Sequence, residues 1–310
     1  MIMQCGEALI DFIPVVDQDG NSAYKPVPGG SPFNSSIAAA RLGAKSLFFG
    51  RISRDFFGDT LLHTLEQNGV DTRLILRTDQ PSTLAFVEKS ATGEARYAFY
   101  VNDAADRGLL PSDLPKSLPE ELTCIQFGSI SLIPDPVSST ILELVEAEAD
   151  NRVISFDPNI RTILVTDEKD YRSRIDRALA AATVVKISDE DLAWIMPGLS
   201  VKEAASKLVT GRTKLVVVTL GAEGAIAATS EGEYSVGGVT TDVSDTVGAG
   251  DSFHSAILAW LARKKKLSIH GVASLSETEV ETMLAFAAKV AAKTCSRPGA
   301  DPPFLREVIG

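Results

Sequence analysis

Short apolar runs alternate with helical patterns along most of this chain, and that rhythm restricts the fold more than any other feature. Apolar runs typical of buried strands lie at Ile2–Cys5, Ser46–Phe49, Thr123–Phe127, Val153–Phe156, Val184–Ile187 and Leu215–Leu220. Helical patterns lie at 33–42, 57–68, 136–149, 169–182, 201–210, 251–265 and 279–294. Strands that alternate with helices form a mainly parallel sheet with helices on both faces. The rhythm therefore predicts an α/β fold in three layers.

Two segments, 7–27 and 82–107, do not follow this rhythm. They contain alternating patterns, such as Arg96–Tyr100, and turn residues at Gly20 and Gly93. Alternation of this kind is typical of half-buried antiparallel strands. We expect these segments to form a small β lid, inserted into a single domain that spans residues 1–310.

The composition is that of an ordinary globular protein, with 45% hydrophobic and 23% charged residues. A net charge of −11 argues against nucleic acid and against an anionic membrane surface as main partners. No stretch approaches the roughly 18 apolar residues of a membrane span. The three cysteines, Cys5, Cys124 and Cys295, are widely spaced. We therefore expect a cytoplasmic protein whose thiols are free.

Glycine and polar residues follow several of the expected strands. They stand at Gly50–Arg51, Gly128–Ser129, Asp157–Arg161, Ser188–Asp191 and Thr219–Gly224. In an open parallel sheet, ligands bind beyond the carboxyl ends of the strands. The pattern predicts a binding cleft along one edge of the sheet.

The segment Asp245–Asp251 reads as a tight turn that leads into an apolar helix. Gly248, Ala249 and Gly250 stand at the helix N-terminus, where unpaired N–H groups and the helix dipole attract an anion. Asp251 follows in the first turn, and the dipole there is expected to keep its pKa low. An anion cradle beside a carboxylate is what phosphoryl transfer to a hydroxyl requires.

A second glycine-rich turn, Pro28–Asn34, opens another expected helix. It is either a plain loop with a helix cap or a place where backbone approaches a polyol, with Asn34 bonding its hydroxyls. Asp11 is an acid within an apolar run. It is either a strand-end surface group or a carboxylate that accepts two sugar hydroxyls.

Several other chemistries lack their motifs. The chain has no Gly-Lys dipeptide of a Walker P-loop, and Gly248–Phe253 lacks the third glycine of a dinucleotide fingerprint. No paired His or Cys spacing indicates a zinc site, and His63, His254 and His270 are scattered. We expect structural or solvent-exposed roles for these histidines, and no nicotinamide-dependent dehydrogenase.

The two glycine-rich segments, Gly29–Asn34 and Asp245–Asp251, resemble the signature regions of the PfkB, or ribokinase-like, carbohydrate kinases. Thr219–Gly224 is similar to that family's nucleotide-binding turn, and the resemblance covers nearly the whole chain. Three further segments look most like those of bacterial fructokinases: Gly6–Asp11, Asp157–Arg161 and Thr294–Ala300. The resemblance implies ATP-dependent transfer to a sugar hydroxyl, with fructose going to fructose 6-phosphate.

The resemblance also implies roles for individual residues. Asp251 is implied to be the catalytic base, and the N–H groups of Gly248, Ala249 and Gly250 to form the anion hole. The residues implied to bind the sugar are Asp11, Gly29, Gly30, Asn34, Asn159 and Arg161. Those implied on the nucleotide side are Lys186, Ser188, Thr219, Gly221 and Gly224. The implied cofactor is Mg²⁺ with ATP, and many members hold a monovalent cation such as K⁺ near the equivalents of Asp245 and Val247.

The chain departs from the family pattern at two of these places. Ser188 and Asp191 replace a frequent Asn-x-x-Glu element that helps to hold Mg²⁺ through water, so this role falls to Asp191 or to Glu190. Val247 replaces a frequent threonine, so a cation there would use the backbone carbonyl.

The alternatives for function are a 2-keto-3-deoxygluconate kinase, another PfkB sugar kinase, and a non-catalytic sugar-binding regulatory protein. Exposed apolar lid residues such as Phe99 are expected to pair two subunits in a homodimer.

Overall fold

The computed structural model describes residues 1–89 and 95–309, and its centre is a nine-stranded sheet. The strands are β1 (Ile2–Cys5), β4 (Ser46–Ser53), β5 (Asp71–Thr78), β8 (Cys124–Gly128), β9 (Val153–Asp157), β10 (Val184–Ser188), β11 (Leu215–Thr219), β12 (Gly224–Ala228) and β13 (Glu233–Gly237). Their order is β13-β12-β11-β10-β9-β8-β1-β4-β5. All neighbours from β5 to β11 are parallel, and β12 and β13 continue the sheet as an antiparallel hairpin.

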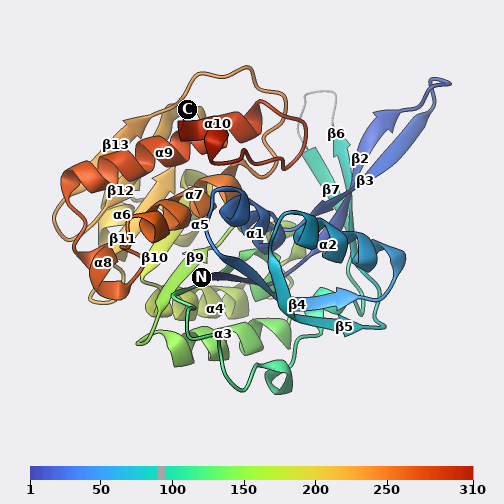
Figure 1. Ribbon diagram of the computed structural model, residues 1–310, viewed down its shortest axis with the longest axis horizontal. Helices are drawn as coiled ribbons and strands as arrows, with labels where there is room; N and C mark the ends of the chain where they lie inside the picture. Colours follow the sequence, from blue (N-terminus) through green and yellow to red (C-terminus); the bar gives the residue numbers. More distant parts are fainter. Residues whose placement is uncertain (90–94, 310) are drawn as a thin grey trace.

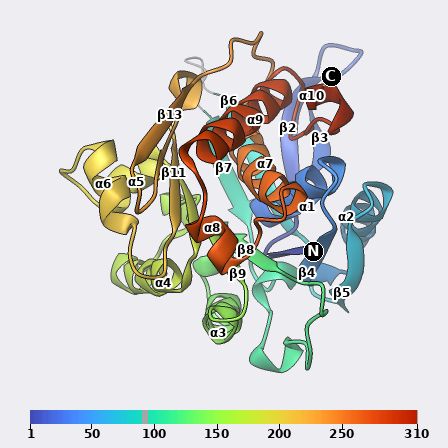
Figure 2. The ribbon, with the colours of Figure 1, turned by 60° about the vertical axis from the view of Figure 1, so that its left-hand side comes forward.

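Helices cover both faces of this sheet (Figure 2). One face carries α1 (Ser31–Arg41), α2 (Phe56–Gln67), α7 (Ala249–Arg263), α8 (Ile269–Ala273) and α9 (Glu277–Cys295). The other carries α3 (Val137–Glu148), α4 (Glu168–Ala181), α5 (Asp189–Ile195) and α6 (Val201–Leu208). The short α10 (Arg306–Ile309) contacts α9. The expected α/β class, with a mainly parallel sheet flanked by helices, is confirmed. Within the described residues, no helix combines the length and the apolar character needed to cross a membrane.

The alternation of side chains along the buried strands explains why two helical layers form. In β11, Leu215 and Val217 pack in the core beneath α7 and α9, whereas Val216 and Val218 pack in the core on the opposite face. Because successive side chains of a strand point to opposite faces, a strand that is apolar at every position needs cover on both sides. Burying such side chains supplies roughly 1.5–3 kcal/mol each.

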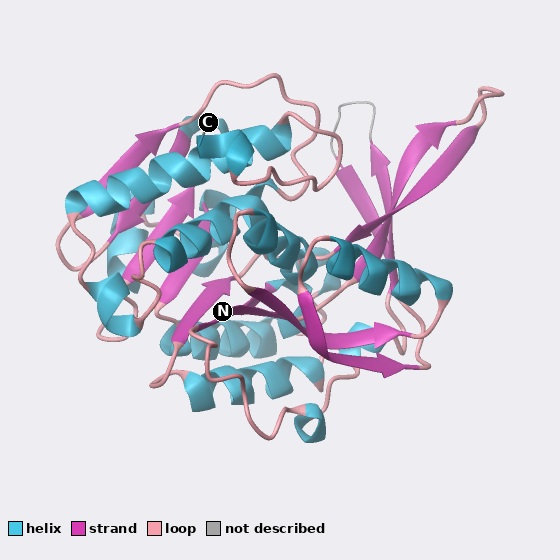
Figure 3. Cartoon of the chain, in the orientation of Figure 1, coloured by secondary structure: helices cyan, strands magenta, loops and turns pink. Residues whose placement is uncertain are grey.

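A second sheet of four strands projects from the body beside α1 and α2 (Figures 1 and 3). Its order is β3 (Ser22–Gly29), β2 (Leu9–Val16), β6 (Thr83–Lys89), β7 (Ala95–Tyr100). The pair β2–β6 is parallel and the other two pairs are antiparallel. The expected turn at Gly93 lies outside the described residues.

The two faces of this small sheet differ in chemistry. One face carries a cluster of rings from Phe12, Tyr24, Phe86 and Tyr100, with Phe12 and Phe86 stacked at 4.4 Å. The other face carries Asp11, Ala85 and Phe99, because Asp11 pairs in register with Ala85 and Ala85 pairs with Phe99. Asp11 and Phe99 both line a pocket at the carboxyl ends of the central strands, so this second face is directed toward that pocket.

Candidate active site

A pocket of about 280 Å³ opens at the carboxyl ends of the central strands, between the small sheet and the N-termini of α1 and α7. Ten residues expected at a site line it: Asp11, Gly30, Asn34, Asn159, Arg161, Lys186, Val247, Gly248, Gly250 and Asp251. Eight others that were not assigned individual roles also line it, and three of them, Ser129, Asp157 and Thr246, lie in segments expected at the cleft; the eight are Glu7, Leu9, Ser31, Phe99, Ser129, Ile130, Asp157 and Thr246. The fold therefore brings both glycine-rich turns to one cavity.

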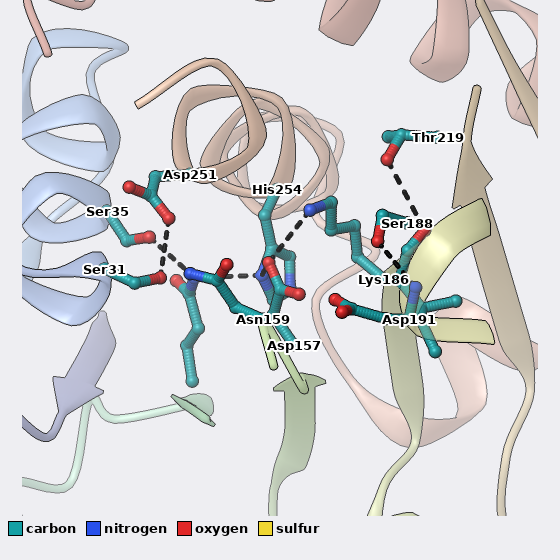
Figure 4. Close-up of polar contacts among 12 residues, drawn as sticks. Ser31, Ser35, Asp157, Asn159, Lys186, Ser188, Asp191, Thr219, Asp251 and His254 are labelled. Carbon is teal, nitrogen blue, oxygen red and sulfur yellow. Dashed lines mark hydrogen bonds and ion pairs between the residues drawn. The ribbon is translucent and has the colours of Figure 1, made fainter. Parts of the chain in front are cut away.

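Asp251 lies in the first turn of α7 and is only 8% exposed. Its Oδ1 accepts a hydrogen bond of 2.6 Å from the hydroxyl of Ser31, and its Oδ2 accepts one of 3.0 Å from the amide of Asn34. Both donors belong to α1, so the carboxylate is held between two helix N-termini (Figure 4). This arrangement fixes the carboxylate at the edge of the pocket.

Burial raises the pKa of Asp251, and this corrects the expectation of a low value. The hydrogen bonds from Ser31 and Asn34 act in the opposite direction but do not outweigh the desolvation of the charged form. A carboxylate with a raised pKa is a stronger base than an exposed one, which suits it to accept a proton from a hydroxyl.

The turn before Asp251 depends on Gly248, which caps α7 with a left-handed φ of 74°. A Cβ atom on Gly248 would also lie 2.6 Å from the side chain of Ala300, so the position is closed to other residues. Gly248 and Gly250 line the pocket, whereas the N–H of Ala249 donates to the carbonyl of Thr246 at 3.3 Å. The pocket wall is therefore made by Gly248 and Gly250 rather than by all three small residues.

Lys186 and Asp157 form a buried ion pair at the ends of the neighbouring strands β10 and β9. The Nζ of Lys186 lies 3.0 Å from Oδ2 of Asp157, and each side chain is 6% exposed (Figure 4). The other oxygen, Oδ1 of Asp157, is buried and has no hydrogen-bond partner within the described residues. The pair places a positive and a negative charge in the wall of the pocket that Asp251 also lines.

His254 lies one turn after Asp251 on α7 and is fully buried behind the site. Its Nδ1 lies 3.0 Å from the amide of Gln126, and its Nε2 lies 2.6 Å from the hydroxyl of Ser155. Because the amide donates, Nδ1 is the acceptor and Nε2 carries the proton. Burial lowers the pKa of His254 to about 4, so the ring is neutral. A neutral ring with a hydrogen bond at each nitrogen is consistent with the structural role expected for His254.

Asp11 faces the pocket from β2, and burial raises its pKa to about 6, while Arg161 lowers it in part. A Cβ on Gly29 would lie 2.2 Å from Oδ2 of Asp11, so this glycine leaves room for the carboxylate without itself lining the pocket. Phe99 was expected on an exposed surface, but it lines the pocket. Successive side chains of a strand point to opposite faces, and here the neighbouring Tyr100 takes the outer face, where it is 64% exposed.

Two strand ends that border the pocket have a non-glycine residue in the left-handed region. Ser129, after β8, has a φ of 58°, and Asn159, after β9, has a φ of 40°. The two turns are joined, since the N–H of Ser129 donates to the carbonyl of Pro158. Non-glycine residues in the left-handed region cost free energy and occur most often at functional sites.

Glu7 is a site residue that the sequence analysis did not single out. It is 1% exposed and accepts hydrogen bonds from the N–H of Ser31 at 3.1 Å and from the hydroxyl of Ser131. Burial raises its pKa to about 7. The signal was present in the sequence, since Glu7 stands two residues after the strand Ile2–Cys5 and directly before another apolar run.

The remaining expected residues lie beside the pocket rather than in its wall. Ser188 caps α5 by accepting the N–H of Asp191, and Oδ1 of Asp191 accepts the N–H of Ile160. Burial raises the pKa of Asp191 to about 6, with Asp157 adding to the effect, whereas Glu190 is exposed. Thr219, Gly221 and Gly224 stand at the carboxyl end of β11 and in the turn after it.

Asp245 joins two loops at the base of α7. Its Oδ1 accepts the N–H of Val247 at 3.1 Å, and its Oδ2 accepts the N–H of Gly299 at 3.1 Å. The N–H groups of Ser244 and Asp245 also donate to the carbonyl of Cys295. The carboxylate therefore joins the turn before Gly248 to the loop that follows α9.

Comparison with known proteins gives one consistent result. The model of the pfkB family of carbohydrate kinases matches residues 1–306. A fructokinase of Rhizobium leguminosarum bv. trifolii is 43% identical over 277 residues, which cover 89% of this chain and 84% of that protein.

Solved structures agree with this result. A fructokinase from Xylella fastidiosa with bound ATP superposes with a TM-score of 0.91 at 29% identity, covering 99% of this chain and 96% of that one. A fructokinase double mutant from Vibrio cholerae O395, described as bound to fructose, ADP and potassium, has a TM-score of 0.84 at 27% identity, with coverages of 100% and 98%. The family resemblance seen in the sequence is thereby confirmed.

Proposed function

This chain belongs to the pfkB family of carbohydrate kinases, and we propose that it transfers the γ-phosphoryl group of ATP to fructose, forming fructose 6-phosphate. One observation carries the proposal. A buried carboxylate, Asp251, lies in the first turn of α7 and lines the same pocket as the polar side chains of Asn34 from α1 and Asp11 from β2. In the proposed reaction, the acceptor hydroxyl of the sugar and the γ-phosphoryl group of ATP therefore come together beside the carboxylate of Asp251.

In the proposed reaction, Asp251 orients the acceptor hydroxyl and takes its proton as the oxygen bonds to phosphorus. Asp11, Asn34 and Arg161 bind the other hydroxyls, and their side chains surround the pocket on the side of the small sheet. Gly29 and Gly30 allow the backbone to come close, and Asn159 borders the same region. Positioning of this kind accounts for most of the rate in a loose phosphoryl-transfer step.

The N–H groups of Gly248 and Gly250 are proposed to bind the transferring phosphoryl group at the positive end of α7. The nucleotide is proposed to extend from there along the ends of β10 and β11, past Lys186, Ser188 and Thr219 to the turn Gly221–Gly224. Support comes from the parallel order of these strands, whose carboxyl ends meet at the pocket.

The residues at the end of β10 fit a magnesium-nucleotide complex better than a metal caged by protein. The described residues contain no cluster of three or more metal-binding side chains, while Asp191 and Glu190 offer carboxylate oxygens beside the proposed phosphate path. Mg²⁺ is commonly held by one or two carboxylates together with phosphates and water. We assign Asp191 and Glu190 to this role, in which the bound ion would neutralise phosphate charge.

Oxygen donors also suit the proposed monovalent cation, K⁺. The carboxylate of Asp245 and the carbonyl of Val247 lie in the turn that precedes Gly248. Because this turn sets the start of α7, an ion held there would stabilise the backbone that receives the phosphoryl group.

The small sheet is proposed to act as a lid that excludes water from the transfer, as Asp11 and Phe99 on its inner face support. Its outer face presents Tyr24 and Tyr100, which are 48% and 64% exposed, and this ring cluster supports a homodimer formed through the lid. Cys5 and Cys124 are buried free thiols, which supports a cytoplasmic location.

A sugar-panel assay tests the proposal. Purified protein is incubated with MgATP and fructose, ribose, glucose or 2-keto-3-deoxygluconate, with and without K⁺, and products are identified by mass spectrometry and NMR. Fructose 6-phosphate is the expected product, with K⁺ raising the rate. Turnover of the keto acid alone would contradict the assignment, and sugar binding without any phosphorylation would indicate a regulatory protein.

A further inference from the structure

Positive charge is scarce in the described wall of the pocket. Arg161 and Lys186 are the two cations there, against the carboxylates of Glu7, Asp11, Asp157 and Asp251. Lys186 is the more deeply buried of the two, at 5% exposure, and it interrupts an otherwise apolar strand, β10. A buried ammonium is costly unless it is paired, so its presence in this strand calls for a reason beyond folding.

The ammonium of Lys186 lies against the helix N-terminus that precedes the base. Its Nζ is 3.0 Å from the point that a Cβ atom on Gly250 would occupy, and Gly250 is followed directly by Asp251. A cation at the positive end of a helix is unfavourable by itself. Asp157 offsets this with one hydrogen bond of 3.0 Å, whereas an ammonium has three protons to donate.

We propose that Lys186 is a catalytic residue of the phosphoryl transfer, and that Asp157 is the residue that positions it. This inference rests on the proposed kinase function. The resemblance assigned Lys186 to the nucleotide side of the site, whereas this inference assigns it to the phosphoryl group that is transferred. Its ammonium and the N–H groups beside Gly250 would bind that same group.

The step balances without any further reactant. The acceptor oxygen of the sugar forms a bond to the γ-phosphorus, and the bond between that phosphorus and the oxygen bridging to the β-phosphate breaks, leaving its electron pair on ADP. The hydroxyl proton goes to Asp251. Lys186 keeps its proton and donates hydrogen bonds to the phosphoryl oxygens, whose charge it stabilises in the transition state.

Asp157 explains why the ammonium of Lys186 does not make Asp251 too weak a base. Lys186 lowers and Asp157 raises the pKa of Asp251, so their effects on the base oppose one another. Besides Asp157, the ammonium acts on two other carboxylates, since Lys186 lowers the pKa of both Asp251 and Asp191. The pair therefore keeps a cation beside the reacting phosphorus while Asp251 stays free to accept a proton.

The test compares Lys186→Gln with the matched control Lys202→Gln, which changes an exposed lysine on α6. We expect Lys186→Gln to lower kcat by about 100-fold or more. We also expect it to weaken ATP binding about tenfold more than ADP binding, because only ATP carries the γ-phosphoryl group. The KM for fructose should stay within about threefold, and Lys202→Gln should match the parent protein.

A kcat within about threefold of the parent, or an equal loss of ATP and ADP affinity, would overturn the inference. Failure of the proposed function has a different signature, since the unaltered protein would then phosphorylate no sugar.

If Lys186→Gln unfolds because it leaves Asp157 as an unpaired buried charge, the double variant Asp157→Asn, Lys186→Met removes both charges together. The same losses of kcat and of ATP preference are expected in it. Recovery of kcat in the double variant would show that Lys186 serves only to neutralise Asp157.

Discussion

The hydroxyl of Ser31 donates a hydrogen bond of 2.6 Å to Asp251, although the two residues are 220 positions apart in the chain. Ser31 is the first residue of α1, and Asp251 lies in the first turn of α7. The bond therefore joins the two glycine-rich turns, one on the proposed sugar side and one on the proposed phosphoryl side. A movement of either turn changes the environment of the base.

Replacing Ser31 should move the pH dependence of catalysis. The hydrogen bond from Ser31 lowers the pKa of Asp251, so Ser31→Ala is expected to raise that pKa. The ionised form is the active base, so the acid limb of the kcat profile should shift to higher pH. Ser36→Ala, which removes a hydroxyl that donates to the carbonyl of Phe33, is the control from the same helix. An acid limb that does not move would show that Ser31 does not tune the base.

Replacing Asp251 should abolish most of the activity while leaving the fold intact. Asp251→Asn keeps the shape of the side chain but cannot take the hydroxyl proton. We expect kcat to fall by 10²–10⁴, as is typical for loss of a general base, with fructose binding changed by less than about tenfold. Asp242→Asn, at an exposed acid before the same turn, is the matched control. Steady-state kinetics and calorimetric binding separate the two effects, and a kcat loss below about tenfold would exclude Asp251 as the base.

Asp11 should control the affinity for the sugar in a pH-dependent way. Its ionised carboxylate can accept two hydroxyls, whereas the protonated form loses acceptor capacity. Since burial raises its pKa to about 6, kcat/KM for fructose should fall as the pH drops below 6. Asp11→Asn should raise KM by about tenfold at pH 8 and show less of this fall. Asp17→Asn, at an exposed turn of the same small sheet, is the control, and identical profiles for Asp11→Asn and the parent would contradict the role.

Most of the strand and helix order could be predicted because the buried parallel strands are apolar at most positions. The exceptions have physical reasons. Strand β12 is Gly224–Ala228, whose alanines have low strand propensity, so its place in the sheet depends on pairing with β11. Helix α7 begins at Ala249, two residues before its expected start, because the left-handed cap at Gly248 sets the first turn.

Site residues that lie within one short motif could be predicted from the sequence. Contacts between motifs that are distant in the sequence could not. Asp251 and Asn34 stand out in local motifs, but their hydrogen bond depends on the packing of α1 against α7. Lys186 interrupts an apolar strand, a signal that a counter-charge lies nearby, and Asp157 at the end of the next strand supplies it. The pKa of Asp251 was wrongly expected to be low because sequence shows the helix dipole but not the burial.

Glu7 was assigned no role from the sequence, yet it is buried in the pocket wall. Its burial leads to a prediction about how the stability of the protein depends on pH. Its carboxylate joins the start of α1 to Ser131, and burial raises its pKa from an ordinary 4.5 to about 7. The folded protein therefore holds this proton more tightly than the unfolded chain does. Stability from this group is fully present below pH 4.5 and is lost as the pH rises to 7, by roughly 3 kcal/mol.

Glu7→Gln should remove this loss, because a glutamine keeps the acceptor for the N–H of Ser31 and carries no charge. Between pH 4.5 and 8, the difference in unfolding free energy should move in favour of Glu7→Gln by about 2–3 kcal/mol. Urea unfolding of both proteins across this range measures it. Asp106, whose pKa burial also raises to about 6, titrates in both proteins, and because it also raises the pKa of Glu7 its contribution cancels only in part. A difference that stays constant with pH would mean that Glu7 is ionised in the fold throughout this range, held by its serine partners against the cost of burial.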